Sequence, residues 1–106
     1  MHHYRARFDD VEGWESPSHG VRVKRLSNGP ASLRLIEMLS TAEHPEWCET
    51  GHSGSVIEGE IEIEFDGGVV RFEAGDGIVI PPGREHRHRP RAISTRVRLA
   101  LVDSPG

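Results

Sequence analysis

The sequence predicts an all-β protein, folded as a small antiparallel β-barrel or jelly roll. Apolar and acidic residues alternate strictly from Glu60 to Phe65, which is the period-two pattern of a half-buried strand. The chain contains 12 glycines and 7 prolines, and many of them separate short apolar segments as turn residues do. No stretch sustains helical periodicity, so we expect about eight or nine short strands.

A hairpin is predicted around Asp66-Gly67-Gly68, directly after the alternating strand. Its register should place Ile63 opposite Val70 and Glu62 opposite Arg71, because a slip of one residue would exchange the two faces. Further strands are expected at 21–26, 32–39 and the C-terminus. The residues expected to face inward are Ile61, Ile63, Phe65, Val70, Phe72, Val97, Leu99 and Leu101.

The length of 106 residues predicts one domain, with residues 1–20 as an N-terminal arm and 21–106 as the barrel. The net charge of −4 gives no reason to expect nucleic acid as a partner. Six arginines lie between Arg84 and Arg98, and we interpret them as a solvated strand face that balances the acidic residues of 58–64. With one cysteine, no signal peptide and no long apolar segment, neither a disulfide nor a membrane span is predicted, and a cytoplasmic location is expected.

The segment from Gly75 to His86 carries the most informative motif, Gly-Asp-Gly-Ile-Val-Ile-Pro-Pro-Gly-Arg-Glu-His. It combines a tight turn, a short apolar strand and a stiff bend, followed by a histidine expected to start the next strand. This pattern resembles the second conserved motif of the cupin family, although Pro90 stands where the family has asparagine. The resemblance implies a barrel of cupin type in which His86 points inward and binds a metal ion.

The segment before it resembles the first cupin motif only in part. Residues 55–59 match the end of that motif, and counting back places His52 at the position of the family's glutamate. Cys48 then takes the place of the second histidine, Glu46 that of the first if the shorter spacing applies, and Ser40 that of the leading glycine. The usual set of two histidines and a glutamate is therefore absent. The chain is similar to small single-domain cupins of unassigned function, which carry a comparable Trp-Cys-x-x-Gly-His-x-Gly segment.

These residues predict a metal site made of Cys48, His52 and His86, with Glu46 as its weakest member. A thiolate with imidazoles favours zinc, with iron or nickel as alternatives. Cys48 can equally be a small buried apolar residue, so a metal-free pocket stays an alternative. His88 should share a strand face with His86, as a ligand, a second-layer donor, a general base or a histidine at the barrel mouth. Trp47 should line the pocket or join the core.

Two classes of function follow from this prediction. The first is a metal-dependent enzyme acting on a small organic molecule, with catalytic residues that the sequence does not identify. The second is a non-catalytic cupin that binds or senses a small molecule, without a metal. We also expect a homodimer, because edge strands are commonly covered by pairing and because the N-terminal arm carries apolar residues that need a surface. These are Tyr4, Phe8, Val11 and Trp14.

Overall fold

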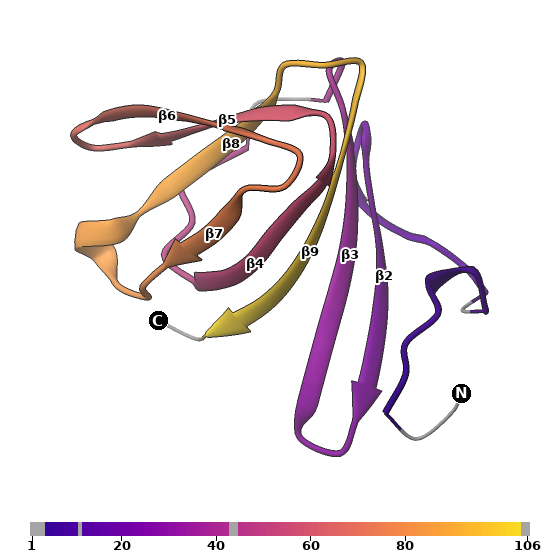
Figure 1. Ribbon diagram of the computed structural model, residues 1–106. Coiled ribbons are helices and arrows are strands. Elements are labelled where there is room, and N and C mark those ends of the chain that lie inside the picture. Colours follow the sequence, from indigo (N-terminus) through magenta and orange to yellow (C-terminus); the bar gives the residue numbers. More distant parts are fainter. Residues whose placement is uncertain (1–3, 11, 43–44, 105–106) are drawn as a thin grey trace.

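The computed structural model describes residues 4–10, 12–42 and 45–104, which contain nine β-strands and two short 3-10 helices (Figure 1). The strands are β1 (Glu15–Ser18), β2 (Val21–Asn28), β3 (Ala31–Leu39), β4 (Gly51–Glu58), β5 (Glu60–Phe65), β6 (Gly68–Glu73), β7 (Gly77–Ile80), β8 (His88–Ala92) and β9 (Arg96–Ser104). The 3-10 helices are η1 (Phe8–Asp10) and η2 (Arg84–His86). Within the described residues, no helix has the length and apolar character needed to cross a membrane.

The strands form two antiparallel sheets. The larger sheet has the order β1-β2-β3-β9-β4-β7, and the smaller one has the order β6-β5-β8. The all-β prediction is confirmed, but the closed barrel is wrong in detail, because no strand ladder among the described residues joins the two sheets. The strands β7 and β8 end their sheets, and η2 lies between them in the chain. The fold is therefore an open jelly roll with two layers (Figure 1).

The hairpin of β5 and β6 has the predicted register. Ile63 is paired with Val70 and Glu62 with Arg71, so both faces keep the alternation seen in the sequence. Val70 departs from the prediction in one respect, since 47 % of it is exposed. The reason is that β6 is an edge strand of the smaller sheet and has a paired neighbour on one side only.

The hydrophobic core lies between the two sheets. Buried side chains of β2, β3, β4, β7 and β9 meet those of β5 and β8 there. Ile61, Ile78 and Val97 are the largest fully buried side chains, and each comes from a different strand. Burying such a side chain stabilises the fold by about 1.5–3 kcal/mol. This core fixes the inward-facing side of β4 and β9, on which the candidate site is built.

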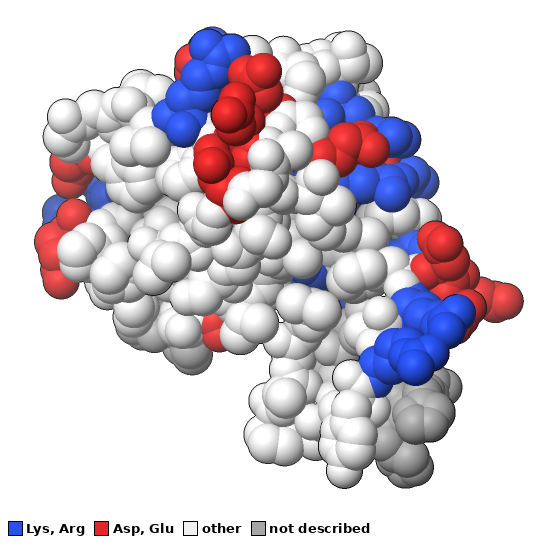
Figure 2. Space-filling model, in the orientation of Figure 1, with Lys and Arg blue, Asp and Glu red and all other residues white. Residues whose placement is uncertain are grey.

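Three arginines of the cluster form cross-strand ion pairs with the acidic residues of 58–64, as the sequence interpretation proposed, whereas Arg98 pairs with Glu37 of β3. In the smaller sheet, Arg89 contacts Glu64 and Arg91 contacts Glu62, at 2.7 and 2.8 Å. In the larger sheet, Arg96 contacts Glu58 at 2.7 Å. Figure 2 shows basic and acidic side chains next to one another on the face in view, without a large area of one sign. This arrangement favours the solvated-face interpretation over a phosphate-binding patch.

The N-terminal segment packs on its own sheet. The backbone carbonyl of Phe8 accepts a hydrogen bond from Lys24 Nζ at 2.8 Å, and the Trp14 ring lies beneath the guanidinium of Arg22 at 4.1 Å. Strand β1 extends the larger sheet through pairing with β2, although residues 1–20 were predicted as an arm. Val11 lies outside the described residues. With Trp14 engaged in the same chain, the homodimer stays a prediction that rests on exposed edges such as Val79, which is 81 % exposed.

Candidate metal centre

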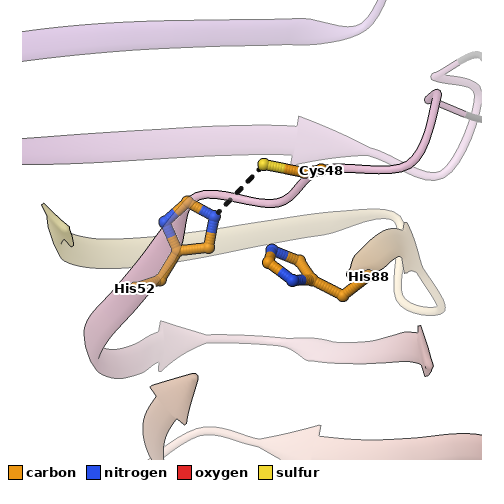
Figure 3. A group of neighbouring side chains, drawn as sticks. All are labelled: Cys48, His52 and His88. Carbon is orange, nitrogen blue, oxygen red and sulfur yellow. Dashed lines mark hydrogen bonds between the residues drawn. The ribbon is translucent and has the colours of Figure 1, made fainter. Parts of the chain in front are cut away.

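Three side chains from different segments converge at one point between the sheets. They are Cys48, His52 and His88, and one ligand atom from each lies within 4.8 Å of the others. Figure 3 shows the thiol and the two imidazole rings turned toward the same space. Sγ of Cys48 and Nε2 of His52 are 3.8 Å apart, and the two rings meet edge to face at 4.9 Å between centroids. In the part of the chain that the structure describes, no second group of three or more His, Cys, Asp or Glu side chains lies close enough together to hold a metal ion.

Backbone contacts bring the three residues together. Cys48 precedes β4 and forms an isolated antiparallel bridge with His88, the first residue of β8. His52 is the second residue of β4, directly after Gly51. A Cβ atom at Gly51 would lie only 2.7 Å from the backbone nitrogen of Pro82, so only glycine fits this approach. The Pro82 bend and the chain before β4 are thus packed directly against each other.

His52 is held by a carboxylate. Its Nδ1 lies 2.8 Å from Oδ1 of Asp103, which is directly opposite it in the pairing of β4 with β9. Because a carboxylate only accepts, Nδ1 carries the proton and Nε2 is left with a lone pair. Burial lowers the pKa of His52 below its usual value, although Asp103 pulls it the other way. Neutral His52 therefore presents Nε2 toward Cys48.

His88 is the most buried residue of the three, with 3 % of its surface exposed. Its Nδ1 donates to the backbone carbonyl of His86 at 3.0 Å, so Nε2 again carries the lone pair. Among the described residues, no hydrogen-bond partner meets this Nε2, although the atom is fully buried. A buried polar atom left without a partner costs about 1–3 kcal/mol. Such an atom, turned toward a thiol and a second imidazole, needs an explanation.

The structure places His86 differently from the sequence expectation. His86 is in η2 and not at the start of a strand, so it does not share a strand face with His88. After the Gly83 bend, the backbone nitrogen of His86 donates to the carbonyl of Gly83 at 3.1 Å, which turns the chain before β8 begins. The side chain of His86 is 42 % exposed, and its Nε2 lies 3.8 Å from Glu85. His86 contacts the group only through its backbone carbonyl, which accepts a hydrogen bond from Nδ1 of His88. His88 supplies the imidazole.

The other predicted residues are distributed around the group. Glu46 is exposed and is not a member of it. Trp47 is partly buried, with the guanidinium groups of Arg87 and Arg89 at 4.5 and 4.4 Å from its ring centroids. Trp47 therefore packs under two arginines.

Sequence reasoning did not find Asp103 and Arg34, which lie behind His52. Arg34 contacts Oδ1 of Asp103 at 2.6 Å, the same oxygen that His52 contacts. Burial would raise the pKa of Asp103, but the hydrogen bonds from Arg34 and His52 hold it below its usual value. The sequence did contain a signal for Asp103, because this residue continues the alternation that turns Leu99 and Leu101 inward. A charged residue at an inward position of a strand is a candidate for a polar site.

Comparison with known proteins identifies the family. A family model described as a cupin domain matches residues 40–102, which is more than half of the chain. The chain belongs to the cupin family. Among curated proteins, no relative of this cupin was found.

Solved structures of other cupins share the fold at low sequence identity. KdgF from Halomonas sp. has a TM-score of 0.76 at 19 % identity, with 94 % of this chain and 93 % of that chain covered. The cupin domain of Cnp3 from Schizosaccharomyces pombe has a TM-score of 0.75 at 18 % identity, over 95 % and 73 % of the two chains. An RmlC-like cupin from Shewanella frigidimarina has a TM-score of 0.73 at 23 % identity, over 97 % and 91 %. At these identities the likeness shows the cupin fold and no particular activity.

Proposed function

We propose that this cupin binds one transition-metal ion, zinc in the first place, through Cys48 Sγ, His52 Nε2 and His88 Nε2. Three protein ligands leave a coordination position for water or for a small organic molecule. The proposal keeps Cys48 and His52 from the sequence prediction and replaces the side chain of His86 by that of His88. Glu46 has no role in it.

The observation that carries the proposal is the unpartnered Nε2 of His88. The atom is buried, it carries the lone pair because Nδ1 donates to a carbonyl, and no group in the described part of the chain satisfies it. Cys48 and His52 turn their own donor atoms to the same space. A bound cation would satisfy all three atoms at once, whereas a packing role would leave the cost of the buried nitrogen unexplained.

The dimensions of the group suit a metal ion. Tetrahedral zinc, with bonds of about 2.3 Å to sulfur and 2.0–2.1 Å to nitrogen, places its ligand atoms roughly 3.3–3.6 Å apart. Cys48 Sγ and His52 Nε2 already lie 3.8 Å apart, and the largest separation in the group is 4.8 Å. Small changes of side-chain rotamer would close this difference, and no movement of the strands is needed.

The donor chemistry favours zinc over the alternatives. A thiolate with two neutral imidazoles is a typical zinc set, while Mg²⁺ and Ca²⁺ prefer oxygen ligands. Iron and nickel also accept these ligands, so competition among metals belongs in the test. Zinc with an open position acts as a Lewis acid and lowers the pKa of a bound water to about 7. The same position would serve a binding or sensing cupin, and the three ligands alone do not favour either class.

The test is metal content and metal affinity of the full chain. We expect about one zinc ion per chain, measured by elemental analysis of protein purified without added metal, and uptake of zinc by metal-stripped protein in a calorimetric titration. Iron, nickel and zinc should be offered separately to the stripped protein. Absence of uptake of all three would contradict the proposal and favour the metal-free alternative, in which His52 and His88 hydrogen-bond a ligand directly.

A further inference from the structure

The residues behind His52 form a chain of contacts that the proposed centre does not itself require. His52 extends from β4, Asp103 from β9 and Arg34 from β3, which are neighbouring strands of the larger sheet. Oδ1 of Asp103 lies 2.8 Å from His52 Nδ1 and 2.6 Å from a terminal nitrogen of Arg34. One carboxylate oxygen on β9 therefore accepts hydrogen bonds from donors on β3 and β4, the two strands that flank β9.

Strand register makes this arrangement rigid. His52 and Asp103 are direct partners across β4 and β9, and Arg34 is paired with Leu101, two residues before Asp103. The side chains at these positions point to the inner face, in line with buried Leu101. The side chain of Arg34 is 16 % exposed and is thus well fixed itself. The position of the carboxylate is consequently set by two strands and not by a loop.

The contact between Asp103 and His52 Nδ1 decides which nitrogen of His52 can bind a metal ion. A neutral imidazole has one N–H and one lone pair, and a carboxylate at Nδ1 forces the proton onto that atom. The lone pair then lies on Nε2, which faces Sγ of Cys48 at 3.8 Å. With the proton on Nε2 instead, His52 would turn an N–H toward the centre and could not bind a cation there. The identity of residue 103 therefore controls whether His52 is a competent ligand.

We infer that Asp103, held in place by Arg34, is the positioning residue of the metal centre and fixes His52 in the tautomer that binds metal through Nε2. The inference rests on the proposed function for its consequence, metal affinity. Its direct claim, the position of a proton on His52, is a property of the protein without metal. Histidine ligands with such an outer partner typically lose 10–100-fold in metal affinity when the partner is removed.

The decisive variant is Asp103→Leu, which has a similar size and no acceptor atom. Oδ1 of Asp103 accepts from both Arg34 and His52, so an asparagine could keep both contacts through its amide oxygen, whereas leucine removes both. Without an acceptor at Nδ1, nothing holds the proton of His52 on that atom, and the proton should move to Nε2. The substitution should leave the core intact, because Asp103 is 32 % exposed at its side chain and borders a cavity of about 230 Å³. Glu58→Gln is the matched control, since it makes the same change of charge on β4 at a carboxylate that contacts Arg96.

The experiment measures the tautomer of His52 by ¹⁵N NMR of the imidazole nitrogens in metal-free full-length protein, and zinc affinity by competition with a chelating indicator. We expect Nδ1–H in the unaltered protein, in Glu58→Gln and in Asp103→Glu, which keeps a carboxylate. In Asp103→Leu we expect Nε2–H and zinc binding about 10–100-fold weaker.

Two results would overturn the inference. One is Nε2–H in the unaltered protein, which needs no variant to be observed. The other is Asp103→Leu protein that binds zinc as tightly as Glu58→Gln. If the unaltered protein shows Nδ1–H but takes up no metal, the proposed function fails, while a shift to Nε2–H in Asp103→Leu still supports the Asp103–His52 assignment. The two failures are thus distinguishable.

Discussion

Cys48 and His88 are joined by a reciprocal pair of backbone hydrogen bonds. The Cys48 nitrogen donates to the His88 carbonyl at 2.8 Å, and the His88 nitrogen donates to the Cys48 carbonyl at 2.9 Å. This bridge connects the segment that leads into β4 of the larger sheet with β8 of the smaller one. Two of the three candidate ligands are therefore held at the junction of the sheets by main-chain contacts, independently of any bound ion.

The first prediction separates His88 from His86. His88→Ala should remove most of the zinc, because it deletes a buried ligand atom. His86→Ala should keep zinc near one ion per chain, because alanine retains the carbonyl that accepts from His88 Nδ1. Elemental analysis of both variants, purified side by side, gives the answer. Loss of zinc in His86→Ala alone would restore the assignment made from the sequence motif.

A second prediction concerns the thiolate. Cys48→Ser replaces the sulfur by a weaker donor of similar size, so zinc affinity should fall by more than the ~10–100-fold that loss of an outer partner costs. With Co²⁺ as a spectroscopic substitute for zinc, the unaltered protein should show a sulfur-to-metal charge-transfer band in the near ultraviolet. The band should be missing in Cys48→Ser. A band of equal strength in both proteins would show that Cys48 is not a ligand.

A third prediction concerns Gly54, two residues after His52. A Cβ atom there would overlap the carbonyl oxygen of Ala100 on the paired strand β9. Gly54→Ala should therefore force the strands apart and cost about 3 kcal/mol or more of unfolding free energy. Gly67→Ala is the control, because a Cβ at Gly67 meets no atom of the described residues within 4 Å. The free energy of unfolding of Gly67→Ala, measured by urea denaturation, should stay within about 0.5 kcal/mol of that of the unaltered protein. Equal effects of the two substitutions would contradict the predicted clash.

The fourth prediction is a pH dependence of stability that Glu37 causes. Glu37 is 5 % exposed and lies between Arg22 and Arg98, with contacts of 2.8 and 3.0 Å. Burial would raise its pKa, but the hydrogen bonds from both arginines hold it below the usual 4.5. A group with a lowered pKa in the folded state stabilises the fold above its unfolded pKa and loses that contribution as pH falls. Stability should therefore decline from about pH 4.5 downward.

The substitution Glu37→Gln tests this assignment. It should lower the free energy of unfolding by about 1–3 kcal/mol at pH 7 and flatten the decline below pH 4.5. Glu62→Gln serves as a control for an ion pair on the surface and should change stability by less than about 1 kcal/mol. Urea titrations of the three proteins from pH 7 to 3 give both quantities. An unchanged acid decline in Glu37→Gln would assign it to other carboxylates.

The sequence predicted local features well and the approach of distant segments less well. The β5–β6 register followed from alternation and turn chemistry, both of which act over a few residues. The position of His86 did not follow, because a 3-10 turn after Gly83 changes which residue starts β8. Asp103 was missed since its partner, His52, is fixed only by the pairing of β4 with β9. Spacing within a motif carries no information on that pairing.

The cross-strand ion pairs of the arginine-rich segment have a consequence for encounters with other molecules. Arg87, Arg89, Arg91, Arg96 and Arg98 each contact a carboxylate on a neighbouring segment. Paired charges of opposite sign produce a field that decays within a short distance, so these arginines of the two sheets offer little long-range attraction to ions of either sign. A charged molecule should reach them at a rate set by diffusion and shape, and that rate should change little with ionic strength.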